Sequence, residues 1–215
     1  MSGSELATAL ASLGVATCYE AAGRVGLIDV PLTALSAGVS VAGPARIAAC
    51  GQGDNRAVHE AMAHVRPGDV LVLRMPQPEP VALLGELLAT QAMTQGAAAV
   101  LVDAAVRDTT QLRLLGLPVW ARFVSVRGAT KQVRGAVDVP VSVGGCAVGP
   151  RDWIVLDDDG AWTVPASGAE ALVAAARARV EREEKLLEQY RAGLLSYDLY
   201  GMRAEDEQGH NADRS

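Results

Sequence analysis

The sequence predicts an α/β fold with a mixed, partly parallel central sheet and a long C-terminal helix. Short apolar runs typical of buried strands alternate with stretches of helical periodicity, and glycines and prolines separate them. The 215 residues suffice for one domain of ordinary size with an appended element. Half of the residues are hydrophobic but only 4% are aromatic, so the core must consist mainly of Val, Leu, Ile and Ala.

The chain is expected to open with a helix and to continue into extended segments. Ser2 and Glu5 have the spacing of a capping box before an apolar run, which is typical of a helix N-terminus. Residues 30–50 are rich in β-branched residues and small residues, and we expect them to be extended, with Gly43-Pro44 as a turn.

A short helix and a buried strand follow. Asp54 or Asn55 is expected to cap a helix that runs through about Val65. After the Pro67-Gly68 turn, the run VLVLRM at 70–75 has the length and composition of a buried strand.

The middle of the chain predicts a strand–helix–strand unit. Residues 81–96 have apolar side chains at helical spacing, and Gly96 is suited to the position just after a helix. AAAVLVD at 97–103 predicts the next buried strand, so that 70–75 and 97–103 lie parallel in one sheet.

The last strands are expected at 117–124 and 137–143, followed by a hairpin. In that hairpin 153–156 pairs with 161–165 around a turn at Asp159-Gly160.

A long helix should close the domain. Ser167 and Glu170 repeat the capping-box spacing, and about 24 helical residues would extend for roughly 36 Å. A helix of that length exceeds what a small domain covers, so we expect its far end to reach a neighbouring subunit. The predicted organisation is an α/β domain at 1–166, this helix at 167–201 and a polar, disordered tail at 202–215.

Composition excludes several classes of protein. The net charge of −6 and pI of about 5.1 argue against binding nucleic acid through phosphates. No apolar run has the roughly 18 residues that a membrane span needs, and the N-terminus lacks the basic segment of a signal peptide. Three widely spaced cysteines do not form a disulfide scaffold or a thiolate zinc site. We therefore expect a cytoplasmic protein with no nucleic-acid or membrane partner.

The candidate site begins at the predicted helix after the prolyl segment. That helix should start near Leu84-Gly85, which leaves the backbone amides of Glu86, Leu87 and Leu88 without helical partners. Such amides favour a carboxylate or phosphate, and Gly85 lets a ligand approach the backbone closely.

The following helix and strand should bring residues 104–108 back beside Glu86. Arg107 can hold a carboxylate or an enolate oxygen, while Asp108 and Glu86 can place a hard divalent cation directly or through water. The alternative is a surface ion pair between Arg107 and Asp108 with Glu86 as a solvated helix residue. Spacing alone leaves both interpretations open.

These residues stand within a wider resemblance that covers nearly the whole chain. An acid, twenty intervening residues and Arg-Asp is the signature of the RraA-like family, and Glu86 followed by Arg107-Asp108 has this spacing. The sequence resembles the class II aldolases of that family, which cleave 4-hydroxy-4-methyl-2-oxoglutarate or 4-carboxy-4-hydroxy-2-oxoadipate. The similar segments are TCYEAAGRVGLID, GDNRAVHEAM, RPGDVLVL, GELLATQA, VDAAVRD, PVWARFVSVRGATK, VPVSVGGCAV, DWIVLDDDG and EEKLLEQYRAGLLSYDLYGMR.

The resemblance implies an RraA-like swivelling β/β/α domain and a metal-dependent enzyme. Mg²⁺ or Mn²⁺ would be held directly by Asp108, and through water by Glu86 and by an acid from a neighbouring subunit's C-terminal helix. Glu183 is the first choice for that acid, with Glu184 as the alternative. The protein would form a homotrimer or a hexamer.

The resemblance also implies the reaction. The carboxylate of a small 2-oxo acid would lie on the amides of Leu87 and Leu88, next to Gly85 and Arg107. Retro-aldol cleavage would give pyruvate and a second oxo acid through a pyruvate enolate, with oxaloacetate decarboxylation as a side activity.

Relatives also place the motif containing Asn55 and His59 near the substrate; the structural alternative is a helix cap with a histidine one turn later. Only Lys131 and Lys185 are lysines, so a Schiff-base aldolase has two candidates, and Lys185 lies among acids that favour its charged form.

Two departures from the family pattern bear on the substrate. The family usually has Asp at the position of Glu86, and the additional methylene moves the carboxylate about 1.5 Å outward. Arg74-Met75 replaces a segment that in relatives resembles DxG, in a region expected to border the cavity.

Two other functions are therefore weighed against the aldolase. One is a changed 2-oxo acid substrate. The other is a non-catalytic regulator that binds a ribonuclease, although such RraA-like regulators tend to lack the aspartate after the arginine.

Overall fold

The structure is a computed structural model that describes residues 1–212, with only the backbone described for 208–212. The chain forms two compact units, Met1–Ala176 and Arg177–Ser215.

The first unit is built on a mixed sheet with strand order β1-β6-β5-β3-β2-β10-β11, with β4 added along β5 and β7 along β2. The pairs β2/β3, β3/β5, β4/β5 and β5/β6 are parallel, and the other pairs are antiparallel. This confirms the predicted mixed, partly parallel sheet. The strands are β1 Thr33–Ala34, β2 Val41–Ala49, β3 Val70–Arg74, β4 Ala82–Leu84, β5 Ala99–Val106, β6 Val119–Val124, β7 Ala136–Val137, β10 Trp153–Asp157 and β11 Gly160–Val164; the strands β8 Val141–Val143 and β9 Cys146–Val148 form a separate ribbon.

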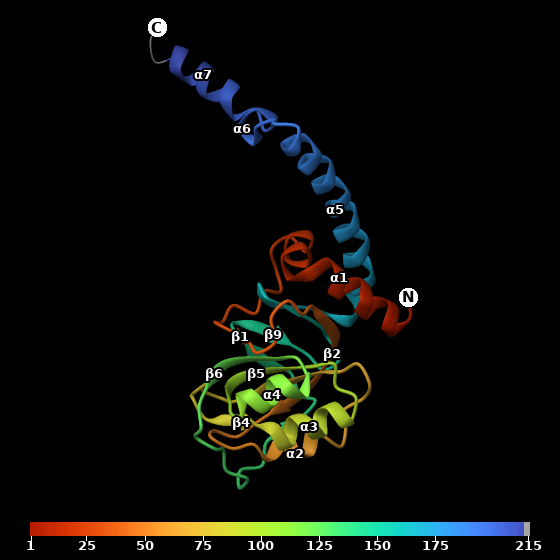
Figure 1. The fold of residues 1–215 in the computed structure, drawn as a ribbon, viewed down its shortest axis with the longest axis vertical. Helices are drawn as coiled ribbons and strands as arrows, with labels where there is room; N and C mark the ends of the chain where they lie inside the picture. The colour runs from red at the N-terminus through yellow and green to blue at the C-terminus, as the bar shows by residue number, and fades with distance from the viewer. Residues whose placement is uncertain (213–215) are drawn as a thin grey trace. The chain divides into compact units, whose positions relative to one another are not determined.

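Helices cover this sheet in two places. Figure 1 shows α2, α3 and α4 gathered on one face, while α1 packs against β2, β10 and β11. The bounds are α1 Gly3–Ala21, α2 Arg56–Ala61, α3 Glu86–Thr94 and α4 Thr109–Leu115.

The alternation of side chains along the strands divides the core. Leu71 and Leu73 of β3 pack towards the helical face, whereas Val70 and Val72 pack on the opposite face with residues of β8, β9 and β10. Every residue of β5 is buried, as expected for a central strand of a parallel sheet.

Several sequence predictions are confirmed. Ser2 and Glu5 form the capping box of α1. Strands β3 and β5 flank α3 and lie parallel. Strands β10 and β11 form the predicted hairpin, but Asp157 pairs with Gly160, so the two-residue turn is Asp158-Asp159 and not the predicted Asp159-Gly160.

The turn predicted at Gly43-Pro44 is wrong, because both residues lie inside β2. Residues 41–44 pair with β10 in the antiparallel sense, and 45–49 pair with β3 in the parallel sense. The proline therefore stands where the strand changes partner. A Cβ on Gly43 would lie 2.2 Å from the Gly68 carbonyl oxygen, so glycine permits a close approach of two backbones.

Other boundaries differ because tertiary pairing overrides local pattern. Residues Ala82–Leu84, which share the apolar spacing of the predicted helix, add to β5 as strand β4, and the helix expected to start near Leu84-Gly85 begins at Glu86. The helix predicted through Val65 ends at Ala61. The strand predicted at 137–143 is interrupted, since Asp138 has a φ of 52° and its carboxylate accepts a hydrogen bond from the Ile47 amide.

The C-terminal helix also begins differently from the prediction. A 3₁₀ turn at Ala166–Gly168 precedes α5, Ala169–Arg191. The capping box predicted at Ser167 is wrong, because the Glu170 carboxylate instead accepts a hydrogen bond of 2.7 Å from the N-terminal amine of Met1.

The second unit continues with two further helices, α6 Ser196–Leu199 and α7 Met202–Ala212. The prediction of a disordered tail from Met202 is wrong for the residues through Ala212, and 213–215 lie outside the described residues. An ion pair between Arg203 and Asp198 joins the start of α7 to α6.

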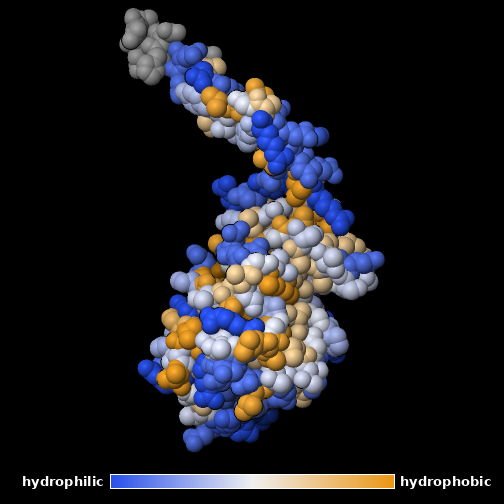
Figure 2. Space-filling model, in the orientation of Figure 1, coloured by the Kyte–Doolittle hydropathy of each residue, from blue (hydrophilic) through white to orange (hydrophobic). Residues whose placement is uncertain are grey.

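In Figure 2 the surface of this unit is mostly hydrophilic with scattered hydrophobic side chains. Within the part of the chain that the structure describes, none of the helices has the length and apolarity needed to cross a membrane.

Candidate functional site

A pocket of about 580 Å³ lies where α3 and α4 begin. Its wall comes from the start of α3, from the residues after β5, from α2 and from the segment after β6. The lining residues are Asn55, His59, Ala82, Leu83, Leu84, Gly85, Glu86, Leu87, Leu88, Gln91, Arg107, Asp108, Gln111, Ala129 and Lys131.

The N-terminus of α3 forms one side of this pocket, as predicted. Gly85 is the N-cap residue, and the first bond within the helix runs from the Ala89 amide to the Gly85 carbonyl oxygen. The amide of Glu86 donates to Asp108 Oδ2 at 3.1 Å, and the amides of Leu87 and Leu88 precede the first helical bond. This arrangement suits an anionic ligand.

Gly85 lies so close to the Arg-Asp pair that a side chain does not fit. A Cβ there would lie 2.6 Å from Asp108 Oδ2 and 3.0 Å from Arg107 Cγ. The glycine predicted to permit close approach to the backbone is therefore needed, here by two side chains of the site itself.

Arg107 and Asp108 directly follow β5. The amide of Arg107 donates to the Leu84 carbonyl oxygen at 3.0 Å, which ties the end of β5 to the start of α3. Arg107 Nε lies 3.6 Å from Asp108 Oδ2, and the two side chains are 48% and 41% exposed. An exposed pair of this kind contributes little to stability, on the order of 0–1 kcal/mol.

Asp108 also has an unusual backbone. Its φ of 55° and ψ of 40° lie in the left-handed region, at the N-cap of α4. Non-glycine residues in this region are uncommon, and such strain is concentrated at functional sites. The strained backbone aims the carboxylate at the amide of Glu86 rather than at the start of its own helix.

The donor set fits a hard cation that retains most of its water. Asp108 and Glu86 bring two carboxylates to one pocket. Among the residues that the structure describes, no group of three or more His, Cys, Asp or Glu side chains could enclose a metal ion. Mg²⁺ is commonly held by only one or two carboxylates together with waters and substrate, which agrees with this pair.

Asn55 and His59 line the same pocket, as the resemblance implied. Asn55 is the N-cap residue of α2, but its side chain makes no capping bond; Asp54 instead accepts from the Arg56 amide at 2.8 Å. Asn55 Nδ2 donates to the Leu83 carbonyl oxygen, and the buried Oδ1 has no hydrogen-bond partner among the described residues.

Burial and the nearby Lys131 ammonium lower the pKa of His59, while the Asp54 carboxylate acts in the opposite direction.

Two further positions bear on the site, Glu183, which was predicted, and Lys131, which was not predicted to line it. Glu183 belongs to the second unit, where its carboxylate lies 2.7 Å from Arg179 Nη2. Lys131 lines the pocket, although sequence reasoning considered it only as a Schiff-base amine. Lys131 reaches the pocket because its neighbour Thr130 forms a β-bridge with Asp54. These two segments are distant in the sequence, and no local sequence pattern predicts such a pairing.

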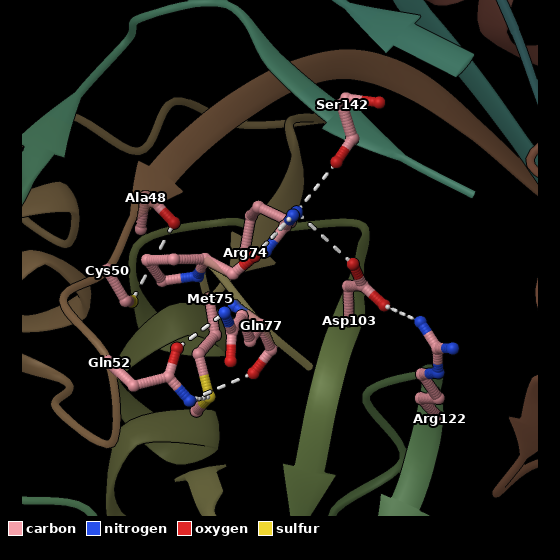
Figure 3. Close-up of polar contacts among 10 residues, drawn as sticks. Ala48, Cys50, Gln52, Arg74, Met75, Gln77, Asp103, Arg122 and Ser142 are labelled. Atoms are coloured by element: carbon pink, nitrogen blue, oxygen red, sulfur yellow. Dashed lines mark hydrogen bonds and ion pairs between the residues drawn. The ribbon is translucent and has the colours of Figure 1, made fainter. Parts of the chain in front are cut away.

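The Arg74-Met75 departure does not reach the pocket. Figure 3 shows Arg74 directed towards Ser142 and Asp103, and Arg122 on the other oxygen of Asp103. Arg74 Nε donates to the Ser142 carbonyl oxygen at 2.6 Å and lies 3.3 Å from Asp103 Oδ2. Met75 is fully buried. The expectation that this segment borders the cavity is therefore wrong, because Arg74 is used to neutralise a buried aspartate.

Comparisons with known proteins match this chain to a family. The family described as Aldolase/RraA (RraA-like) matches residues 15–162. A protein of Thermus thermophilus named 4-hydroxy-4-methyl-2-oxoglutarate aldolase is 35% identical over 52% of this chain and 68% of its own length. A protein of Halalkalibacterium halodurans, which carries that name in provisional form, is 34% identical over 67% of this chain and 69% of its own length.

Solved structures agree on the fold and carry different names. RraAS2 of Streptomyces coelicolor, described as an unusual member of the RNase ES inhibitor RraA protein family, has a TM-score of 0.72 at 32% identity, over 84% of this chain and 94% of its own. The RNA-processing inhibitor RraA from Thermus thermophilis has a TM-score of 0.59 at 30% identity, over 66% of this chain and 84% of its own.

Proposed function

Because this chain belongs to the Aldolase/RraA family, we propose that it is a divalent-metal-dependent (class II) pyruvate aldolase. Its reaction would be the retro-aldol cleavage of a 4-hydroxy-2-oxo dicarboxylic or tricarboxylic acid, of the 4-hydroxy-4-methyl-2-oxoglutarate type, to pyruvate and a second oxo acid. The observation that carries this proposal is the convergence of the Glu86 amide, Asp108 and Arg107 on one pocket at a helix N-terminus.

Substrate binding would use the start of α3. The carboxylate next to the 2-oxo group would accept hydrogen bonds from the amides of Leu87 and Leu88, where the helix dipole favours negative charge. Arg107 would hold the neighbouring oxygen from the side. A volume of about 580 Å³ is suitable for a small organic acid.

Asp108 would hold Mg²⁺ or Mn²⁺ directly, with Glu86 acting through water. When bound, such an ion polarises the 2-oxo group and stabilises the negative charge that develops on it. Two observations support this assignment. Gly85 has no side chain that would displace the Asp108 carboxylate, and the pocket has two carboxylate donors.

In this proposal the reaction transfers one proton and develops one negative charge. As the C3–C4 bond breaks, the proton of the C4 hydroxyl passes to an ordered water in the pocket, and the bonding electrons form a pyruvate enolate. Arg107 stabilises the enolate oxygen through a charge-assisted hydrogen bond. Return of this proton from the water to C3 gives pyruvate. Oxaloacetate decarboxylation passes through the same enolate, so we propose it as a side activity.

The proposal is tested by an assay for pyruvate released from 4-hydroxy-4-methyl-2-oxoglutarate, with Mg²⁺ or with EDTA. We expect release only with the cation, and its loss in Asp108→Ala but not in Arg113→Ala, an exposed residue of α4 outside the pocket. Absence of cation-dependent pyruvate release from any 4-hydroxy-2-oxo acid or from oxaloacetate would contradict the proposal.

We further propose that the assembly is a trimer or hexamer in which Glu183 of the partner subunit completes the site. The experiment mixes Asp108→Ala protein with Glu183→Ala protein after reversible dissociation. If the acid comes from the partner, some mixed sites have neither substitution and activity partly returns. If both residues act within one chain, every site keeps one substitution and mixing restores nothing.

A regulatory function is the second candidate, since one similar structure is described as an RNA-processing inhibitor and another as an unusual member of the RNase ES inhibitor RraA protein family. A regulator of this kind would bind a ribonuclease without using the carboxylate at the pocket. Recovery of a ribonuclease by the wild-type chain and by Asp108→Ala alike, with no lyase activity in either, would favour it over the aldolase.

A further inference from the structure

Gln111 is a pocket residue that the proposed reaction does not use. It belongs to the first turn of α4 and lines the pocket together with Glu86 and Asp108. Its side chain is exposed, and within the part of the chain that the structure describes its carboxamide makes no hydrogen bond. The pocket therefore contains a neutral polar group that is available to a ligand.

Asp108 and Gln111 have the spacing of a capping box that does not form. Asp108 is the N-cap residue of α4 and Gln111 is the third residue of the helix, a pattern in which the two side chains normally bond to each other's backbone amides. Here the left-handed backbone of Asp108 directs its carboxylate to the Glu86 amide, and it makes no capping bond to α4. The carboxamide of Gln111 thus lies within one helical turn of Asp108 and is not used as a cap.

A cation at Asp108 would have few protein donors. The pocket supplies two carboxylates, and no group of three or more His, Cys, Asp or Glu side chains exists among the described residues. Mg²⁺ held in this way keeps several waters, whose hydrogens need acceptors. The carboxamide oxygen of Gln111 is an acceptor with two lone pairs. It can order such a water without adding negative charge to the pocket.

The other glutamine in the described lining, Gln91, does not have this relation to a carboxylate. It follows Glu86 by five residues on α3, which places it roughly 140° around the helix axis from Glu86. Gln111, in contrast, is three residues from Asp108, and residues at this spacing are neighbours on a helix surface. The position of Gln111 therefore suits an action on the cation.

We propose that Gln111 is a positioning residue for the cation, and that its carboxamide oxygen accepts a hydrogen bond from a water that the cation retains. This inference rests on the proposed metal-dependent function and adds a residue to its cation site. Because Gln111 would act only through that water, its loss should weaken cation binding and leave the chemical step intact once the cation is saturating.

The test is calorimetric titration of Mn²⁺ into the metal-free full-length chain. We expect Gln111→Met to raise the Kd for Mn²⁺ by about 10-fold, the lower end of the range for groups that orient metal ligands. Gln111→Glu should instead lower the Kd, because a carboxylate at this place attracts the cation. Gln95→Met and Gln95→Glu are the matched controls, since Gln95 is exposed at the far end of α3 and outside the pocket, and neither should change the Kd by more than about twofold.

Steady-state kinetics distinguishes this role from substrate binding. In Gln111→Met the Mg²⁺ concentration that gives half-maximal pyruvate release should rise, while kcat at saturating Mg²⁺ stays within about twofold of wild type. A loss of kcat that persists at saturating Mg²⁺, or an unchanged Kd for Mn²⁺ in this variant, would overturn the inference. An equal rise of the Kd in Gln111→Met and Gln111→Glu would also contradict it, because it would indicate a structural effect.

The wild type and Asp108→Ala separate this inference from the function on which it rests. If the wild type binds Mn²⁺, Asp108→Ala abolishes that binding and Gln111→Met leaves it unchanged, the cation site stands and the role of Gln111 is wrong. If the wild type binds no Mn²⁺, the proposed metal-dependent function itself fails.

Discussion

Arginine and aspartate meet in two very different settings in this molecule. Near the start of β3, Asp69 is 1% exposed and contacts both Arg46, at 3.2 Å, and Arg151. Its Oδ2 also accepts from the Arg66 amide at 2.9 Å. At the pocket, Arg107 and Asp108 are nearly half exposed and 3.6 Å apart.

The difference shows that a buried ion pair stabilises the fold, whereas an exposed pair remains able to contact a ligand. A buried carboxylate must have its charge and its hydrogen bonds satisfied by the protein, so Asp69 is committed to its neighbours. The pair at the pocket is open to solvent and loosely matched, and it can therefore exchange protein contacts for ligand contacts. The Asp103 cluster in Figure 3 resembles the first setting, which explains why Arg74 contributes nothing to the pocket wall.

Asp69→Ala is expected to have the largest effect, and that effect is on stability. Removing this carboxylate takes away one of the two carboxylate partners of the buried Arg46, which keeps Asp138, and also removes the acceptor of Arg151 and of the Arg66 amide. We therefore expect the free energy of unfolding to fall by about 3–5 kcal/mol. Urea denaturation followed by circular dichroism measures it. Asp108→Ala is the matched control and should change stability by less than about 1 kcal/mol. Similar losses in the two variants would mean that exposure does not distinguish the two settings.

Arg107→Ala should have the opposite effects, a large loss of activity with little change in stability. We expect kcat/KM for pyruvate release to fall by two to three orders of magnitude, about 3–4 kcal/mol, because stabilisation of the enolate is lost. Thermal unfolding should be nearly unchanged, since the side chain is 48% exposed. Steady-state kinetics beside Arg113→Ala checks this. A decrease under tenfold would show that Arg107 does not contact the reacting atoms.

Gly85→Ala sharpens the comparison within the pocket. The added methyl would lie 2.6 Å from Asp108 Oδ2, so the carboxylate must move away from the Glu86 amide. We expect about a tenfold loss of kcat/KM, roughly 1.4 kcal/mol, and weaker apparent binding of Mg²⁺. Gly3→Ala has open space around it and serves as control. Unchanged activity would show that the close approach is not required.

The smallest effect concerns His59. Its pKa is lowered in the folded protein, chiefly by burial and then by Lys131, so NMR titration should give a value below about 6.5 and Lys131→Met should raise it. Because the unfolded chain binds this proton more readily, the contribution of His59 to stability is present above about pH 6.5 and is lost as the pH falls through that value towards the folded pKa. A His59 pKa unaffected by Lys131→Met would contradict the contact.

Local patterns predicted the parts of the fold and site that depend on local physics. The capping box at Ser2, the buried run of β3 and the return of Arg107-Asp108 to Glu86 follow from periodicity, capping and element length. Residues whose positions are fixed by partners distant in the sequence were not predicted.

Pro44 and Lys131 are examples of residues whose positions were not predicted. Pro44 occurs within a strand because β10 and β3 pair on either side of it. Lys131 reaches the pocket through Asp54, 77 positions earlier in the sequence, and hydrogen bonds over such separations have no local signature.

The continuity of β2 has a consequence for how this domain comes apart. One uninterrupted strand belongs to both the parallel and the antiparallel portions of the sheet, so neither portion can detach while β2 keeps its neighbours. Opening the hairpin of β10 and β11 exposes backbone that also borders the strands beneath the pocket. We therefore expect amide exchange of β2 to report global unfolding, with the pocket and the N-terminal helix losing protection in the same cooperative event.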